Sequence, residues 1–237
     1  MSSPEPYAVP PATLSHFQSN PWANSFISSP DYVPIETRSR TAKPTGEDAF
    51  FANTLGAANA IPHCLTLRRR DVATPGPPAP SESVPEKGSK STARQAAPKP
   101  KPDMVTLFYL ERPGVLGHPS VAHGGVVATL LDEVMSLAVS LHVPNSGLDE
   151  AEIRNRIYTV QLDTSFKRKV SVPGLVVVKA WCNASEGGRK FWMRGEIVQE
   201  EGEGGDNGGG GHLEWTKRKR VCAEAKGFWL ANRAEKL

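Results

Sequence analysis

The chain has 237 residues, which is enough for one large domain or for one ordinary domain with tails. A hydrophobic content of 38% is low for a chain folded throughout, and 21 prolines and 21 glycines indicate that a sizeable part lies outside a core. The net charge is only +3 and the basic residues form small clusters, so the composition by itself does not indicate a nucleic-acid-binding protein, and we predict no nucleic-acid partner.

The cysteines and histidines do not form metal or disulfide patterns. Cys64, Cys182 and Cys222 are scattered and have no CxxC spacing, so we predict buried thiols in a reducing compartment. Three histidines have no partner at metal-ligand spacing, and we predict no metal site. These are His118, His142 and His212. The sequence has no apolar run long enough to predict a membrane-spanning helix. The first residues lack the basic character of a signal or transit peptide.

In the N-terminal part of the chain, segments that predict a helix or a strand stand between segments that predict no regular structure. Residues 1–45 place a few aromatic side chains among Ser, Pro and Asn, which predicts an extended, disordered arm that could drape over a domain and include one helical turn, without a core of its own. A single domain is then expected over residues 46–237, beginning with a short amphipathic helix at 47–55 and a strand at 63–72. Residues 74–102 are dominated by Pro, Ser, Lys, Ala and Glu, which predicts a disordered insertion inside that domain.

The rest of the chain is predicted to form strands around one helix. Residues 104–110 are a predicted strand, and the run 126–141, rich in Ala, Leu and Val, indicates a largely buried helix. Residues 200–212 are Gly-rich and predict a flexible hairpin loop. Four strands are expected after the helix, at 158–168, 175–182, 191–198 and 221–230. This layout predicts an α+β domain in which a curved antiparallel sheet wraps one long helix.

The start of the predicted helix carries residues suited to chemistry. His123, Gly124 and Gly125 stand just before it, where unpaired N–H groups and the helix dipole favour negative charge and where glycines permit close approach. Asp132 lies two to three turns further on, where a carboxylate is costly unless it has a partner or a function. A backbone that stabilises an anion, together with a buried acid, indicates an acyl-transfer site.

The same residues also have structural interpretations. The two glycines could serve only a tight helix start. Asp132 could be satisfied by the hydroxyl of Thr129 or Ser136, three and four residues away on the same helical face. Glu133 points about 100° away around the helix, which favours a solvated or ion-paired side chain.

The motif His123-Gly124-Gly125, with Asp132 nine residues after the histidine, resembles the HGG-type hotdog-fold acyl-CoA thioesterases. The branch of thioesterase superfamily members 4 and 5 is the most similar, and stretches at 166–168, 186–191 and 223–225 support it in the same order. The resemblance implies a hotdog fold that forms a homodimer or a dimer of dimers. It also implies active sites at the interface, where the helix N-terminus of one subunit faces the acid of the other.

The resemblance also implies roles for single residues. Gly124 would donate its N–H to the thioester carbonyl of an acyl-CoA substrate, and His123 would stabilise the turn. Asp132 would be a general base on water or a direct nucleophile, with Thr159 orienting the water. Coenzyme A carries a 3′-phosphate and a pyrophosphate, for which Arg and Lys are natural partners. The residues expected to bind the substrate are Gly125, Lys167, Arg168, Arg189 and Lys190. No cofactor is implied, since coenzyme A is part of the substrate.

Two features depart from the family pattern, and one alternative function stays open. Gly117 stands where some relatives have Asn, and the interval 142–157 is longer than expected. The alternative to an enzyme is a non-catalytic acyl-CoA-binding or scaffold protein with the same fold. A hotdog dehydratase is disfavoured, because the acid here comes far after the histidine. The named relatives are mitochondrial, but the N-terminus favours the cytoplasm, with the mitochondrion as the alternative.

Overall fold

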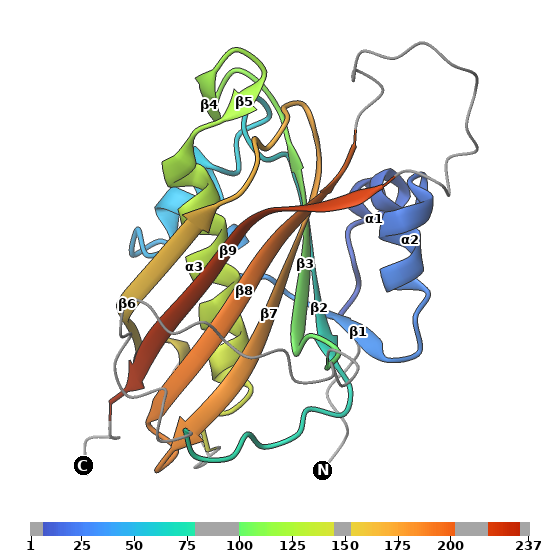
Figure 1. The fold of residues 1–237 in the computed structure, drawn as a ribbon. Coiled ribbons are helices and arrows are strands. Elements are labelled where there is room, and N and C mark those ends of the chain that lie inside the picture. Colours follow the sequence, from blue (N-terminus) through green and yellow to red (C-terminus); the bar gives the residue numbers. More distant parts are fainter. Residues whose placement is uncertain (1–6, 79–99, 145–152, 202–217, 233–237) are drawn as a thin grey trace.

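The computed structural model describes residues 7–78, 100–144, 153–201 and 218–232. Its central feature is a seven-stranded antiparallel sheet that curves around one long helix, α3 (Gly124–Ser140) (Figure 1). The strand order is β1-β2-β3-β7-β8-β9-β6. The predicted α+β class and hotdog fold are confirmed, with one buried helix packed against a curved sheet.

The strands of the sheet come from both sides of α3 in the sequence. Before the helix they are β1 (Tyr32–Ile35), β2 (His63–Arg69) and β3 (Met104–Leu110). After it they are β6 (Ile157–Phe166), β7 (Gly174–Glu186), β8 (Lys190–Glu200) and β9 (Lys219–Ala231). A separate two-stranded ribbon, β4 (Leu116–His118) and β5 (Val121–Ala122), leads into α3. The ribbon was not predicted, because strands of three and two residues show no hydrophobic period.

The hydrophobic residues of α3 form the main core with the inner face of the sheet. Leu130, Leu131 and Met135 are fully buried, and α3 contacts β3, β6, β7, β8 and β9. Strand β7 is apolar along most of its length because both of its faces are covered. Val178 belongs to the core under α3, whereas Val177 belongs to a second core on the outer face.

The N-terminal segment is not the extended, disordered arm predicted for residues 1–45. It forms α1 (Pro11–Gln18), α2 (Pro21–Ile27) and the edge strand β1, and the two helices lie against the outer face of the sheet (Figure 1). Phe17 is buried there, and Asn20 caps α2 by accepting a hydrogen bond from a first-turn N–H. Helices of eight and seven residues are too short to show a clear helical period in sequence, which is why this prediction was wrong.

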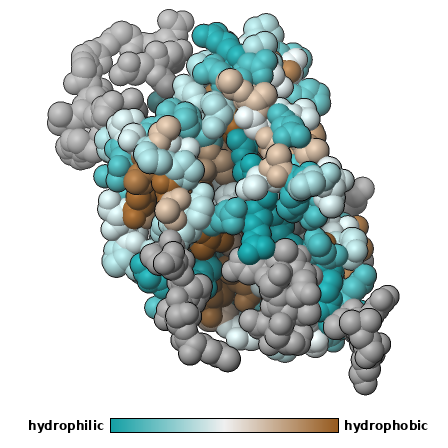
Figure 2. Space-filling view, turned by 180° about the vertical axis from the view of Figure 1, so that it is seen from behind, coloured by the Kyte–Doolittle hydropathy of each residue, from teal (hydrophilic) through white to brown (hydrophobic). Residues whose placement is uncertain are grey.

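Other predicted segments are only partly described. Residues 79–99 of the predicted insertion and 202–212 of the predicted hairpin loop lie outside the described residues. The short helix expected at 47–55 is a single π-type turn, η2 (Phe50–Thr54), preceded by a 3₁₀ turn, η1 (Arg38–Arg40). Seen from behind, the coloured surface is mainly hydrophilic, with hydrophobic residues in limited areas (Figure 2). None of the described helices is both long and apolar enough to cross a membrane.

Candidate active site

The first turn of α3 is organised by the histidine before it. His123 is the N-cap residue, and its Nδ1 accepts a hydrogen bond from the Gly125 N–H at 3.0 Å. A Cβ on Gly125 would stand 3.0 Å from that same Nδ1, so the second glycine leaves room for the cap. The Gly124 N–H is the first of the helix and has no intrahelical acceptor. The turn therefore presents the Gly124 N–H, which has no acceptor within its own helix, at the positive end of the helix dipole.

Gly117, which departs from the pattern that the resemblance implies, has a steric explanation. A Cβ on Gly117 would lie 2.8 Å from the Cα of His123, closer than real Cβ contacts come. Strand β4 packs directly on the backbone of the motif, and no side chain fits between them. Glycine at this position allows β4 to pack this closely against His123.

Asp132 is held by a hydroxyl from the edge strand, not by one from its own helix. Thr159, near the start of β6, donates from Oγ1 to Asp132 Oδ1 at 2.8 Å. Ser136 instead accepts a hydrogen bond from the indole N–H of Trp229 at 2.9 Å. Burial raises the pKa of Asp132 above its usual value, and the hydrogen bond from Thr159 offsets part of this rise. The structure thus brings together the two side chains that the sequence placed 27 residues apart.

The glycine turn and the acid are separated along the helix. Gly124 and Asp132 are eight residues apart, which at 1.5 Å per residue is about 12 Å. Phe166, at the end of β6, lies beside Gly124, with ring carbons 3.6 Å from where a Cβ would be. Thr159, near the start of the same strand, lies beside Asp132. Within one chain, a single carbonyl group cannot contact both the Gly124 N–H and the Asp132 carboxylate.

The four basic residues fall into two pairs at opposite ends of the sheet. The first pair, Lys167 and Arg168, directly follows β6; Lys167 lies 3.5 Å from Glu224, and Arg168 donates to a backbone carbonyl of β9. The second pair, Arg189 and Lys190, stands at the start of β8 and donates to a β9 carbonyl and to Glu186. On β9, Phe166 pairs with residue 223 and Lys190 with residue 230. One chain does not bring these two pairs together.

Residues 120–205 match the Thioesterase superfamily. The matched segment contains α3, β6, β7 and β8, and so it includes both the glycine turn and the Asp132–Thr159 pair. It covers only part of the chain, and α1, α2 and β1 to β3 lie outside it.

Two curated proteins show similarity over a longer stretch. An uncharacterized protein of Schizosaccharomyces pombe is 25% identical over 125 residues, which cover 52% of this chain and 58% of that protein. Verlamelin biosynthesis protein B of a Lecanicillium species is 27% identical over 145 residues, covering 61% of this chain and 54% of that protein. The matches thus span little more than half the length of either protein.

Solved structures resemble the chain more distantly. A hypothetical thioesterase from Streptococcus pneumoniae, determined with coenzyme A, has 18% identity and a TM-score of 0.38, covering 54% of this chain and 80% of that one.

The acid next to Asp132 has a different environment. Glu133 is buried, and its carboxylate lies 3.0 Å from Arg154 and accepts a hydrogen bond from Ser39 at 2.6 Å. Of the two interpretations open for Glu133 in the sequence, the ion pair is the one the structure shows. Arg154 and Ser39 were missed in the sequence, because both lie in irregular or very short segments.

The three cysteines, predicted to be buried thiols, are free; Cys222 is buried, and Cys64 and Cys182 are of intermediate exposure. Burial raises the pKa of Cys64 to about 11 and that of Cys182 to about 12, so neither is poised as a nucleophile. His142, for which no partner was predicted, lies 3.3 Å from Asp103. Within the described parts of the chain, no group of three or more His, Cys, Asp or Glu side chains is placed to hold a metal ion.

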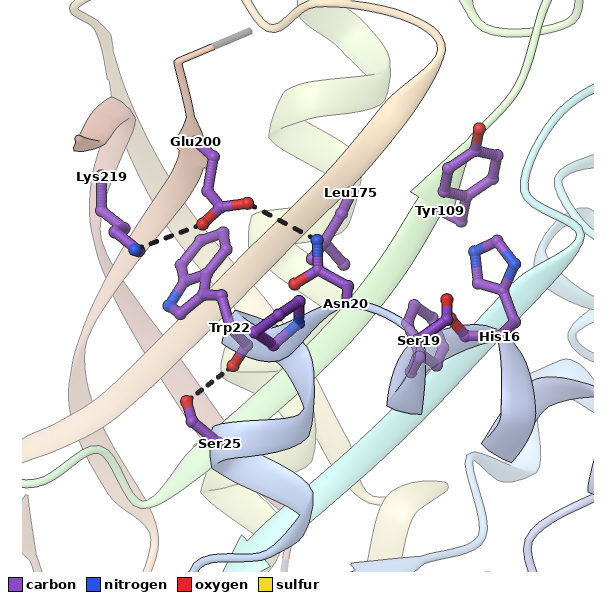
Figure 3. Close-up of a pocket in the computed structure, with 11 residues that line it drawn as sticks. His16, Ser19, Asn20, Trp22, Ser25, Tyr109, Leu175, Glu200 and Lys219 are labelled. Carbon is purple, nitrogen blue, oxygen red and sulfur yellow. Dashed lines mark hydrogen bonds and ion pairs between the residues drawn. The ribbon is translucent and has the colours of Figure 1, made fainter. Parts of the chain in front are cut away.

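A hollow of about 440 Å³ lies away from the glycine turn of α3, between α1–α2 and the outer face of the sheet (Figure 3). His16 and Trp22 line it, and Glu200 crosses it to Asn20, at 3.5 Å, and to Lys219, at 3.2 Å. None of the residues predicted for the site lines this hollow. The carboxylate of Glu200, in this hollow, is already paired with Lys219. We therefore place the candidate active site at α3 and β6.

Proposed function

We propose that this protein is an acyl-CoA thioesterase, which hydrolyses the thioester to a free acid and coenzyme A. The observation that carries the proposal is the pair formed by Asp132 and Thr159. A half-buried carboxylate with a raised pKa, hydrogen-bonded to one hydroxyl, is suited to accept a proton from water near neutral pH. The match to the Thioesterase superfamily over the segment that contains this pair supports hydrolysis of a thioester.

The proposed site requires two copies of the chain, because Gly124 and Asp132 of one copy are about 12 Å apart. Strand β6 is an edge of the sheet, and it exposes Tyr158, Val160 and Phe166 by more than half (53%, 55% and 58%). An open, partly apolar edge strand is suited to pair with another strand. Antiparallel pairing of β6 with the same strand of a second copy brings the start of one strand to the end of the other. Asp132 and Thr159 of one copy then face Gly124 of the other.

The proposed reaction uses these groups in turn. The thioester carbonyl accepts a hydrogen bond from the Gly124 N–H of one copy, and the helix dipole stabilises the negative charge that develops on the oxygen. Asp132 of the other copy takes a proton from a water held by the Thr159 hydroxyl, and the water oxygen attacks the carbonyl carbon. The carbon–sulfur bond then breaks, and coenzyme A leaves as a thiolate that takes up a proton. Direct attack by Asp132 is the alternative, and ¹⁸O transfer from water into the Asp132 carboxylate in a single turnover would reveal it.

The same pairing joins the two basic pairs. Arg189 and Lys190 lie at the Thr159 end of their own sheet, and Lys167 and Arg168 at its Phe166 end. In the two-copy site, one pair from each chain flanks the same substrate. Both are then available to the phosphates of coenzyme A.

The first experiment is thiol release from short, medium, long and aromatic acyl-CoAs, measured on the wild type and on Asp132→Asn, with the mass in solution determined by light scattering. We expect turnover by a dimer or larger assembly, and loss of turnover in the variant. A folded protein that binds acyl-CoA without consuming it would favour the non-catalytic alternative.

Subunit mixing tests the two-copy site directly. Asp132→Asn and Gly124→Ala chains are each expected to be nearly inactive, but a mixed dimer has one site with both residues intact. Random mixing gives half mixed dimers, so about a quarter of the wild-type activity should return. No recovery after verified subunit exchange would contradict a site that combines Gly124 of one copy with Asp132 of the other.

A further inference from the structure

Glu133, the residue after Asp132, is bound from two sides. Both of its carboxylate oxygens face Arg154 Nη2, at 3.0 and 3.4 Å, and Ser39 donates from Oγ to Oε1 at 2.6 Å. The side chains of Glu133 and Arg154 are only 9% and 18% exposed. Burial raises the pKa of Glu133, and Arg154 and Ser39 counteract this by stabilising the charged form. An ion pair with this geometry and little solvent holds its two elements in a defined orientation.

The elements that this ion pair joins are the ones that carry the proposed reacting groups. Glu133 follows Asp132 on α3, and Arg154 stands five residues before Thr159 in the segment that leads into β6. Strand β6 has a neighbour, β9, on one side only. The Glu133–Arg154 pair therefore links α3 to the segment that leads into β6, as the Thr159–Asp132 hydrogen bond links α3 to β6 itself, from a position about 100° further around the helix.

Ser39 connects this arrangement to the N-terminal segment. It is fully buried in η1, two residues after Thr37. Thr37 Oγ1 lies 2.7 Å from Thr66 Oγ1 on β2, which lies 3.2 Å from Thr106 Oγ1 on β3. This buried chain of hydroxyl groups fixes the η1 region to the sheet on the side of α3 away from β6.

We infer that Glu133, Arg154 and Ser39, which we call the clamp, are positioning residues that hold Thr159 against Asp132 and so set the geometry of the water-activating pair. The effect on turnover rests on the proposed function. The inference also gives the N-terminal segment a role, because Ser39 lies outside the thioesterase-matched residues and still supports the site.

The test compares clamp variants with a matched ion pair elsewhere. Arg69 and Asp103 lie 2.9 Å apart with side chains 16% and 7% exposed, close to the values for Arg154 and Glu133. Asp103 lies at the start of β3, and three strands separate β3 from β6. Asp103→Asn is therefore a control that perturbs a similar ion pair far from Asp132 and Thr159.

Two readouts are measured on Glu133→Gln, Arg154→Lys and Asp103→Asn in the full-length protein. With an acyl-CoA that the wild type hydrolyses, we expect kcat of the clamp variants to fall by about 10- to 100-fold, while KM stays within about twofold, since misplacement of reacting groups acts on the chemical step. The kcat of the folded control should stay within about twofold of wild type. Hydrogen exchange at the start of β6 should become faster in the clamp variants and not in the control.

The outcomes separate the clamp from general stability and from the proposed function. Unchanged kcat and exchange in folded Glu133→Gln would overturn the inference, as would an equal loss of kcat in Asp103→Asn. If Glu133→Gln does not fold, Ser39→Ala keeps the ion pair and should still lower kcat several-fold. If the wild type hydrolyses no acyl-CoA, the proposed function fails, while hydrogen exchange still decides whether the clamp holds β6.

Discussion

Asp103 and Asp132 are both carboxylates set against the sheet, in opposite surroundings. The side chain of Asp103 is 7% exposed and has three partners: Arg69 at 2.9 Å, His142 at 3.3 Å and the backbone N–H of Cys182 at 2.8 Å. Among the described residues, Asp132 has the hydroxyl of Thr159 as its hydrogen-bond partner and lies beside the open edge strand.

The difference separates a structural acid from a reactive one. A buried carboxylate whose acceptor sites are filled joins elements together; Asp103 connects β2, β7 and the end of α3. A desolvated carboxylate with spare acceptor capacity is costly to the fold and available to a water or a substrate. The same change, Asp to Asn, should therefore have opposite consequences at the two positions.

At Asp132 the change should remove activity and spare the fold. We expect Asp132→Asn to lower kcat by about 1000-fold, the usual scale for loss of a general base. Its melting temperature at pH 7 should not fall, because the amide oxygen still accepts from Thr159 and no charge is desolvated. Thermal unfolding and kcat are measured on one preparation. A large drop in melting temperature would mean that the carboxylate is structural.

At Asp103 the change should weaken the fold and spare activity. Removing the carboxylate leaves the largely buried Arg69 without its ion-pair partner, and losses of this kind cost about 3 kcal/mol of unfolding free energy. Urea unfolding measures this value. The folded variant should keep kcat within about twofold of wild type. A kcat loss comparable to that of Asp132→Asn would contradict the structural role assigned to Asp103.

The fold was predictable wherever an element was long enough to show its period. Helix α3 and strands β3, β6, β7, β8 and β9 have runs of seven or more residues, and each was predicted near its observed bounds. Helices α1 and α2 were not, because each is short and buries few side chains. Their stability comes from packing on the sheet, which only the folded chain provides.

The candidate site was predictable to the extent that it is local in sequence. Gly124 and Asp132 are on one helix, so their spacing in the sequence is enough to identify them as candidate site residues. Thr159 was reached only through resemblance, since a Thr at a strand start is common. Arg154 and Ser39 contact Glu133 across 21 and 94 residues. No periodicity relates such positions, and only the structure brings them together.

A methyl group on Gly124 tests the other half of the site. A Cβ there would lie 3.6 Å from Phe166, an ordinary contact, and Ala favours a helix over Gly. We expect Gly124→Ala to fold normally and to lose about 30-fold in kcat, because the methyl crowds the carbonyl that the N–H should stabilise. Circular dichroism and thiol release check this. Normal turnover would contradict binding of the thioester carbonyl at the N-terminus of α3.

The pH dependence tests the state of Asp132. Its pKa is raised above 3.8 by burial, so kcat/KM should rise with pH through that higher value as the base loses its proton. In Thr159→Val the hydrogen bond that lowers the pKa of Asp132 is gone, and the acidic limb of the kcat/KM profile should move to higher pH. The contribution of Asp132 to folding stability changes with pH in the opposite direction to kcat/KM. The folded state holds its proton more tightly, so the contribution of Asp132 to stability falls as the pH rises from 3.8 through the raised pKa. A limb that moves down in Thr159→Val would contradict this assignment.

The smallest expected effects concern the basic pairs, whose side chains are largely in solvent. Replacing Lys167 and Arg168, or Arg189 and Lys190, by Ala should raise KM for acyl-CoA about three- to fivefold, since an exposed ionic contact contributes little. The matched substrate is the same acyl group on pantetheine, which has no phosphates, and its KM should not change. In a two-copy site both pairs should contribute, even though they lie at opposite ends of one sheet. An effect of only one pair would place coenzyme A at that end alone, and an equal effect on the pantetheine thioester would assign these residues to folding instead of phosphate binding.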